Sequence, residues 1–148
     1  SAASDVYKRQ IYIAWSATNR SPLIRIPVTR GAGTRVELRC PDPAANPYLV
    51  LAVCLEAGLD GIRNQITPPD AVTENVFEMQ LQQRAKLGIE SLPGDLEQAV
   101  EELEKDDYIK NVLGGHITEK YLGAKRAEWA DYRAQVTEWE IEKYLYKI

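Results

Sequence analysis

Five arginines and a single acidic residue fall close together near the start of the chain. They are Arg20, Arg25, Arg30, Arg35, Glu37 and Arg39. Guanidinium groups bind carboxylates and phosphates through paired hydrogen bonds, and a carboxylate among them can hold a hard divalent cation. The whole chain carries a net charge of −4, so this positive cluster is a local feature. The stretch therefore predicts a site where an anionic, phosphorylated substrate meets a metal ion.

The element that positions these residues is predicted to be a β-strand. Residues 34–39 alternate polar and apolar side chains from Arg35 onward, which is typical of a strand. Arg35, Glu37 and Arg39 then share one face, and the two apolar residues between them can pack against a core. A second interpretation stays open, because arginine–glutamate pairs across a solvated sheet face are common and contribute little to stability.

Three sequence motifs follow one another between residues 19 and 66. They read NRSPLIRIP at 19–27, TRVELRCPDPAANPYL at 34–49 and AGLDGIRNQI at 57–66. In their order and spacing they closely resemble the C-terminal part of the catalytic domain of bacterial type I glutamine synthetase, and the resemblance extends over residues 11–148. Chains of that family are much longer. We therefore expect 11–148 to be a C-terminal fragment of the catalytic domain, preceded by a non-native or disordered leader at 1–10.

The resemblance implies an ATP-dependent glutamate–ammonia ligase. ATP would phosphorylate the side-chain carboxylate of glutamate, and ammonia would displace phosphate from the γ-glutamyl phosphate to give glutamine, with Mg²⁺ or Mn²⁺ as cofactor. By resemblance, the site residues are Glu37 as metal ligand, Arg20 as catalytic residue, Arg20 and Arg39 for glutamate, and Arg20, Arg25 and Arg35 for ATP. Arg30 is a weak candidate for a lysine that some members use to bind ATP.

The number of metal ligands separates two functional hypotheses. One carboxylate cannot build a two-metal site, so we expect the fragment alone to be inactive, although the complete protein would be an enzyme. The alternative is a non-catalytic anion-binding or assembly module that uses the same arginine cluster.

The resemblance also implies how the complete protein assembles and is regulated. Two stacked hexameric rings are expected, with the C-terminal segment, here residues 139–148, reaching into the opposing ring. One branch of the family is switched off by adenylylation of a tyrosine, and the corresponding stretch here is Asn75-Val76-Phe77. Phenylalanine has no hydroxyl to modify. We therefore expect the non-adenylylated branch, which is controlled by glutamine feedback and by binding transcription regulators.

Composition sets broad limits. The 148 residues, 45% hydrophobic and 27% charged, suit one globular domain. No apolar run approaches the length of a membrane span, so no membrane partner is expected, and the negative net charge argues against nucleic acid. Cys40 and Cys54 lack zinc-site spacing and are expected to be buried thiols in a reducing cytoplasm. His116, the only histidine, is expected in a loop or at a helix cap rather than on a metal.

Turn residues and periodicity predict an α+β fold. Short antiparallel strands, forming part of the family's catalytic sheet, occupy the N-terminal end, and a mostly helical C-terminal half follows. The strands are expected at 11–17, 23–27 and 34–39 as a small meander. Helices are expected from Asn46-Pro47, over 79–87, 95–105 and 106–113, and from about Thr118.

Two helical stretches carry further expectations. Residues 48–57 are apolar almost all round, so this helix should be buried. Near the C-terminus an apolar stripe, expected in a core or an interface, consists of Trp129, Tyr132, Val136 and Trp139. Thr137 with Glu140 should cap a restarted final helix.

Overall fold

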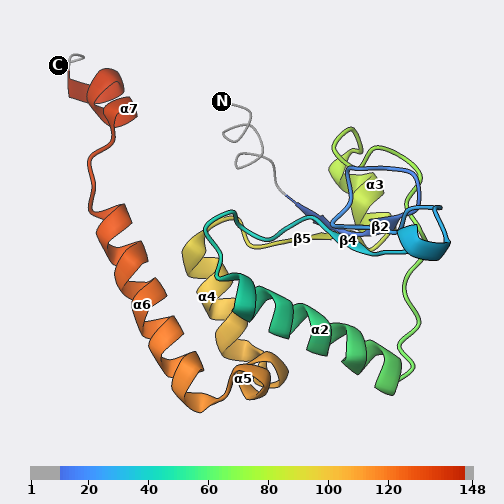
Figure 1. Ribbon diagram of the computed structural model, residues 1–148. Helices are drawn as coiled ribbons and strands as arrows, with labels where there is room; N and C mark the ends of the chain where they lie inside the picture. Colours follow the sequence, from blue (N-terminus) through green and yellow to red (C-terminus); the bar gives the residue numbers. More distant parts are fainter. Residues whose placement is uncertain (1–10, 146–148) are drawn as a thin grey trace. The chain divides into compact units, whose positions relative to one another are not determined.

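The computed structural model describes residues 11–145. The chain divides into two compact units, Ser1–Gly94 and Asp95–Ile148. Strands occur in the first unit, and the described part of the second is helical (Figure 1). This arrangement confirms the predicted α+β class. The predicted leader at 1–10 and the last three residues of the C-terminal segment lie outside the described residues.

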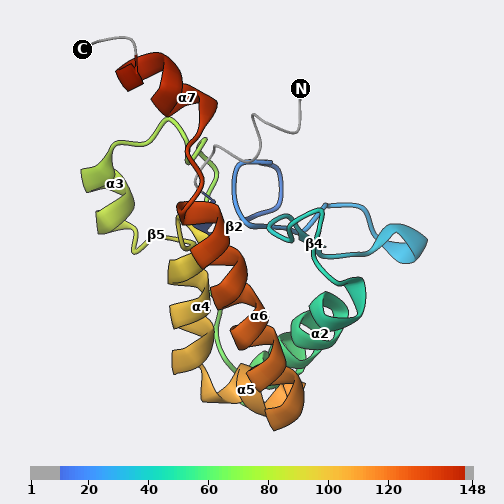
Figure 2. The same ribbon diagram turned by 90° about the vertical axis from the view of Figure 1, so that its left-hand side faces the viewer.

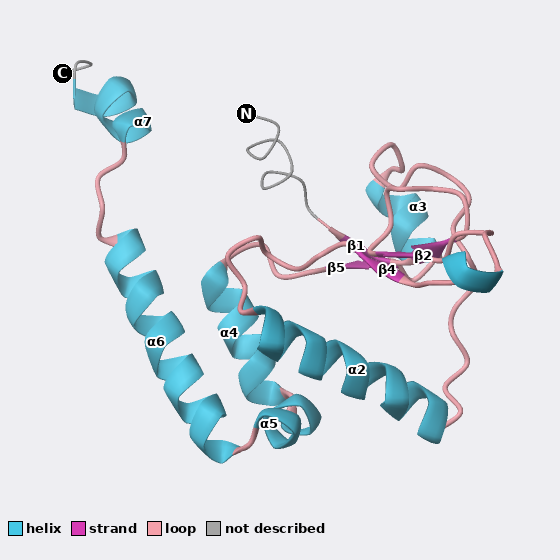
Figure 3. Cartoon of the chain, in the orientation of Figure 1, coloured by secondary structure: helices cyan, strands magenta, loops and turns pink. Residues whose placement is uncertain are grey.

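Among the described residues, five strands of two residues each form two small sheets (Figure 3). The strands are β1 Tyr12–Ile13, β2 Trp15–Ser16, β3 Ile24–Arg25, β4 Glu37–Leu38 and β5 Glu90–Ser91. β1 pairs antiparallel with β5, and β3 lies between β2 and β4 in the other sheet. The first predicted strand is therefore split between two sheets, because its beginning pairs with a segment far along the chain.

The predicted antiparallel meander is wrong in one pairing, because β2 and β3 run parallel. The loop between them turns back on itself. The Ser16 hydroxyl accepts hydrogen bonds from the backbone N–H groups of Thr18, at 3.4 Å, and Asn19, at 3.1 Å. The chain thus returns to the beginning of β2, where the Ile24 N–H donates to the Ala14 carbonyl at 3.1 Å. β3 and β4 pair antiparallel, as predicted.

A small apolar core lies beside β1. It consists of Tyr12, Val76 and Met79, of which Val76 is fully buried. The guanidinium of Arg84, on helix α3 (Leu81–Lys86), lies 4.5 Å from the centre of the Tyr12 ring. This helix confirms the one predicted over 79–87, and its arginine covers the core with a cation–π contact.

Trp15 attaches the loop that follows helix α2 (Pro47–Arg63) to the sheet. Its indole Nε1 donates to the Pro69 carbonyl at 2.7 Å, and its own carbonyl accepts from the Val72 N–H at 2.9 Å. A loop without regular structure is thereby fixed at two points by one strand residue.

Helix α2 spans Pro47–Arg63 and begins where predicted. The Asn46 side chain accepts a hydrogen bond from the Tyr48 N–H at 3.0 Å, and proline occupies the first helical position. The predicted burial is wrong: none of its residues is buried, and Tyr48 is 82% exposed and Leu51 68%. An apolar helix is buried only where a neighbour covers it, and no described strand or helix of the first unit packs closely along α2.

The second unit begins with three helices that pack on one another (Figure 2). They are α4 Leu96–Lys105, α5 Asp107–Leu113 and α6 Gly115–Arg133. Asp95 caps α4 as predicted, accepting from the Gln98 N–H at 2.8 Å. Gly114 ends α5 with a φ of 78°, a left-handed conformation that favours glycine. α6 begins at Gly115, earlier than the predicted Thr118.

Helix α6 ends at Arg133, and a short non-helical stretch follows. A new helix, α7 (Glu138–Glu140), then begins and continues into η2 (Ile141–Leu145). Thr137 and Glu140 form the predicted capping box. The interruption divides the predicted apolar stripe. The tilted rings of Trp129 and Tyr132 lie 5.7 Å apart between their centres within α6. The ring of Trp139 meets that of Tyr144 at 5.8 Å, and Val136 between the two pairs is exposed.

The remaining expectations concern single residues. Cys40 and Cys54 are free and half-buried rather than fully buried. Burial raises the pKa of the Cys40 thiol, and the nearby Cys54 raises it further. His116 lies in the first turn of α6 and is exposed, so it is neither in a loop nor the capping residue. No helix among the described residues is both long and apolar enough to span a bilayer.

Candidate active site

The strand register brings one arginine directly opposite the single acidic residue of the cluster. In the antiparallel pair of β3 and β4, Arg25 faces Glu37 and Ile24 faces Leu38. Side chains of directly opposed residues lie on the same face of a sheet. The guanidinium and the carboxylate therefore meet because of main-chain pairing and not through chance contact of two flexible side chains.

Two arginines hold Glu37. Arg25 Nη1 donates to both carboxylate oxygens of Glu37, at 3.2 Å and 3.0 Å, and Arg35 donates to Oε1 from Nε at 2.9 Å. Arg35 Nη2 also lies 2.7 Å from the same oxygen. The side chain of Arg25 is 19% exposed, that of Glu37 28% and that of Arg35 51%. Two positive charges thus surround one negative charge at a partly exposed position.

The pair of guanidiniums controls the ionisation of Glu37. The hydrogen bond from Arg25 is the largest influence and the one from Arg35 the next, and together they hold the pKa of the Glu37 carboxyl below its ordinary value. The carboxylate is therefore ionised near neutral pH, and the three groups together carry one net positive charge.

One buried donor of Arg25, its Nε, has no hydrogen-bond partner among the described residues. A buried donor without an acceptor costs free energy. Arg25 is thus fixed by Glu37 on one side and unsatisfied at the base of its fork.

The predicted shared strand face is only partly confirmed. Arg35 does contact Glu37, but β4 is limited to Glu37–Leu38, and Arg39 makes no side-chain hydrogen bond or ion pair with a described residue. The backbone N–H of Arg39 donates to the Leu23 carbonyl at 3.0 Å, and its side chain is exposed. The apolar side does not enter a core of the described unit, since Leu38 is 37% exposed.

The two other arginines differ in what their side chains do. Arg20 is exposed, on the loop between β2 and β3, and no described residue pairs with its guanidinium. Arg30 folds back on its own loop, where Nη1 donates to the Pro27 carbonyl at 2.8 Å and to the Thr29 carbonyl at 3.2 Å. Of the predicted site residues, the structure joins Arg25, Arg35 and Glu37 and leaves Arg20 and Arg39 available to a ligand.

The described residues do not by themselves form a metal site. No group of three histidine, cysteine, aspartate or glutamate side chains lies within reach of one ion in the part of the chain that the structure describes. Glu37 offers oxygen atoms of the kind that Mg²⁺ and Mn²⁺ prefer, but it is a single carboxylate and both oxygens already accept from arginine.

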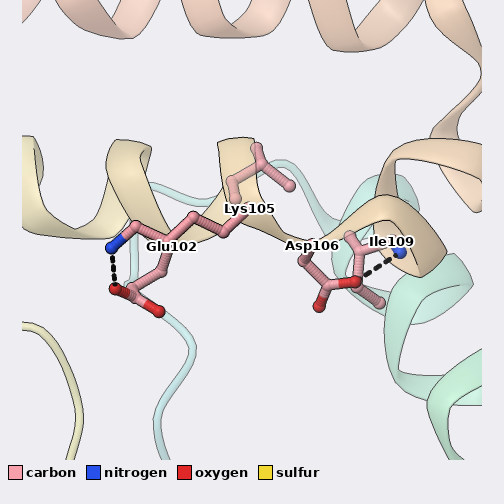
Figure 4. Close-up of a pocket in the computed structure, with 5 residues that line it drawn as sticks. Glu102, Lys105, Asp106 and Ile109 are labelled. Atoms are coloured by element: carbon pink, nitrogen blue, oxygen red, sulfur yellow. Dashed lines mark hydrogen bonds and ion pairs between the residues drawn. The ribbon is translucent and has the colours of Figure 1, made fainter.

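A shallow depression on the second unit is less suitable as a ligand-binding site than the arginine cluster (Figure 4). Lys105 Nζ donates to Glu102 at 2.8 Å, a bond that raises the pKa of Lys105, and the Asp106 carboxylate caps α5 by accepting from the Ile109 N–H at 3.0 Å. These polar groups are therefore engaged in holding their own helices.

The sequence interpretation missed two residues, Asn19 and Ser21, on either side of Arg20. Both contact a segment far along the chain, at Glu74 and Val76. Asparagine and serine in a turn commonly bond to backbone groups. Their presence therefore indicated side-chain-to-backbone hydrogen bonds, but the sequence does not show which backbone groups they reach.

A family model, curated proteins and a solved structure were each found to match most of this chain. Residues 4–144 match the family model for "Glutamine synthetase, catalytic domain". The chain is 52% identical over 141 residues to a glutamine synthetase from Clostridium saccharobutylicum, covering 95% of this chain and 32% of that protein. It is 53% identical over 140 residues to one from Thermotoga maritima, with the same coverage of 95% and 32%.

A solved structure, "Apo GmaS without ligand", superposes with a TM-score of 0.73 at 36% identity, covering 97% of this chain and 32% of that one. The chain therefore spans about a third of the length of the curated relatives that it matches.

Proposed function

Since the chain belongs to the glutamine synthetase catalytic-domain family, we propose that the complete protein ligates ammonia to glutamate in an ATP-dependent reaction. A side-chain carboxylate oxygen of glutamate attacks the γ-phosphorus of ATP, and the bond to the β-phosphate oxygen breaks, which releases ADP. Ammonia then attacks the acyl carbon of the γ-glutamyl phosphate. Phosphate leaves, the nitrogen loses a proton, and glutamine forms.

The observation that carries the proposal is the placement of Glu37 between Arg25 and Arg35. The first chemical step brings two anions together, so positive charge fixed beforehand is the main requirement. The three groups together are positive, and Glu37 holds the guanidiniums in place before substrate arrives. Arg20 and Arg39 add two exposed positive charges on neighbouring parts of the same unit.

We assign the individual roles as follows. Arg39 binds the carboxylate of glutamate, and Arg20 lies where glutamate and ATP meet and stabilises the charge of the transferring phosphoryl group. Arg25 contacts the ATP phosphates, and Arg35, the more exposed of the pair, contacts the nucleotide more loosely. The support is that a guanidinium fork matches both carboxylate and phosphate geometry.

Glu37 is the residue that we propose as a ligand of a divalent cation, Mg²⁺ or Mn²⁺. Its lowered pKa favours the ionised form that a metal requires. The other ligands would come from outside the described residues. A cation bound there would neutralise phosphate charge.

For the complete protein we further propose assembly as two stacked hexameric rings in the cytoplasm, with no nucleic acid or membrane as partner. Trp139, Tyr144 and Leu145 are each at least 57% exposed, which supports a protein-covered role for the C-terminal segment. Phe77, without a hydroxyl, supports the non-adenylylated branch, with glutamine feedback and a transcription regulator as partner. Stable labelling of the complete protein by an adenylyltransferase with labelled ATP would contradict this.

The second candidate is a non-catalytic anion-binding or assembly module. The observation that favours it is the single carboxylate of the cluster, with no group of potential metal ligands among the described residues. Such a module would bind phosphate or ATP through the same arginines without turning over.

The two candidates are separated by assaying the complete protein for glutamine formation with glutamate, ammonia, ATP and Mg²⁺. We expect one ADP released per glutamine formed, and loss of both in Glu37→Gln. Glu90→Gln is the matched control, because Glu90 is an exposed strand residue of the same unit. Binding of ATP without glutamine formation would instead support the module.

A further inference from the structure

The loop that carries Arg20 is ordered from within by side-chain hydrogen bonds. The Ser16 hydroxyl accepts from the N–H groups of Thr18 and Asn19, and the Asn19 carbonyl oxygen Oδ1 accepts from the Ser21 N–H at 2.9 Å. The backbone is thus constrained on both sides of Arg20, while the guanidinium itself is exposed and free to meet a ligand.

The same loop is bonded to a segment 55 residues further along the chain. Asn19 Nδ2 donates to the Glu74 carbonyl, and the Val76 N–H donates to the Ser21 hydroxyl oxygen at 3.0 Å. The two residues adjacent to Arg20 therefore both bond to the main chain of one short segment, residues 74–76.

That segment is anchored in the core through Val76. Val76 is fully buried against Tyr12 and Met79. The Arg84 guanidinium donates to the Met79 carbonyl at 2.7 Å while it covers the Tyr12 ring. Because Val76 is buried, water cannot accept a hydrogen bond from its N–H group. The Ser21 hydroxyl oxygen is the acceptor instead.

We propose that Asn19 and Ser21 are positioning residues that act through Arg20. By holding the backbone of Arg20 against residues 74–76, which the buried Val76 anchors, they fix where its guanidinium projects, so that it is aligned with the transferring phosphoryl group before substrate binds. Small displacements of a charged group at a reacting centre lower the rate steeply. This inference rests on the role proposed above for Arg20.

The test is a double-mutant cycle in the complete protein, with kcat for glutamine formation and thermal stability as readouts. Ser21→Ala should lower kcat on the order of 10-fold with little change in the KM for ATP. In an Arg20→Lys background, which has already lost the guanidinium fork, Ser21→Ala should lower kcat much less, because the two residues act as one unit. A merely structural Ser21 would lower kcat by the same factor in both backgrounds, which would overturn the proposal.

Thr118→Ala is the matched control. Thr118 is 7% exposed and Ser21 9%, and the Thr118 hydroxyl also makes one hydrogen bond with the backbone, donating to the Lys110 carbonyl at 3.2 Å. It should lower the melting temperature and leave kcat unchanged.

Asn19→Ala, at a half-exposed position, repeats the cycle should Ser21→Ala not fold. If Arg20→Lys alone leaves kcat unchanged, the proposed role of Arg20 fails. If Arg20→Lys lowers kcat but the cycle shows no coupling, only the positioning inference fails.

Discussion

The two units of the chain are stabilised by different kinds of interaction. In the first unit, local side-chain bonds order the loops, and further bonds attach them to residues more than 50 positions away, as between Trp15 and Pro69 or Ser21 and Val76. In the second unit, α4, α5 and α7 are capped by the side chain at their own N-terminus, and the ion pairs with Lys donors among the described residues join neighbours on one helix. A unit closed by distant contacts can hold charged side chains in a fixed constellation, whereas locally capped helices mainly supply a scaffold.

The largest effect is expected when the two units are assayed for glutamine formation without the rest of the complete protein. We expect the 148-residue chain to form no glutamine above background with ATP and Mg²⁺, because its described part offers one carboxylate to a metal. Turnover by the chain alone would show that the arginine cluster of the first unit needs no further ligands.

In the complete protein, a single carboxylate in each unit can be compared. Glu37→Ala should lower kcat by on the order of 100-fold or more, because it removes the charge that holds two arginines at the transferring phosphate. Glu104→Ala breaks an ion pair with Arg126 in the second unit and should change kcat little. Similar kcat values for the two variants would remove the functional distinction between the units.

Arg39→Ala should mainly affect substrate binding. Loss of a charge-assisted hydrogen bond raises the KM for glutamate by on the order of 10- to 100-fold, with a smaller change in the KM for ATP. Arg133→Ala, an exposed arginine of α6 beside Glu97, is the control and should leave both KM values unchanged. An unchanged KM for glutamate in Arg39→Ala would contradict its assignment.

A matched pair of buried valines compares the stability of the units with their function. Val76→Ala and Val100→Ala each remove two methyl groups from a buried position and should cost about 2 kcal/mol of unfolding free energy. Only Val76→Ala should also lower kcat, by a few-fold, because the segment that bonds to Ser21 shifts. Thermal melting and kcat of both variants test this, and equal losses of kcat would mean that the effect is global.

The smallest effect concerns two glutamates whose pKa values are lowered for different reasons. Arginines lower the pKa of Glu37, whereas the Thr137 backbone N–H and then its hydroxyl lower that of Glu140. Added salt should therefore raise the pKa of Glu37 more than that of Glu140, as measured by NMR titration. Arg25→Gln should raise the pKa of Glu37 more than Arg35→Gln. The reverse order would contradict the leading influence of Arg25.

Folding lowers both pKa values, which fixes the sign of the pH dependence. Each carboxyl stabilises the folded state above its unfolded pKa of about 4.5 and loses that contribution as the pH falls through the lower folded value. Melting temperatures should therefore decline below about pH 4.5, and Glu37→Gln should lessen the decline.

The sequence predicted the second unit better than the first, for a physical reason. Helix caps such as Asp95 and Thr137 act on neighbouring backbone, so a few adjacent residues reveal them. The partner of β1 lies at β5, and the burial of α2 depends on what covers it, so neither could be found from local pattern.

The candidate site shows the same limit. The strand pattern correctly associated Arg35 with Glu37, because those two are near neighbours. It placed Arg39 as the second arginine, but the register of β3 against β4 brings Arg25 to that position instead. Pairing register was the missing information, since side-chain alternation specifies a face and not the residue opposite.

The attachment of the loop after α2 by Trp15 has an optical consequence. Trp15 is the only tryptophan of the first unit, and the other two, Trp129 and Trp139, lie in the second. Replacing those two with phenylalanine leaves one indole, whose N–H is bonded to the Pro69 carbonyl. Its fluorescence emission then reports on the surroundings of β2 in the first unit, and a red shift during denaturation is expected when this indole loses its bond to the loop and meets water.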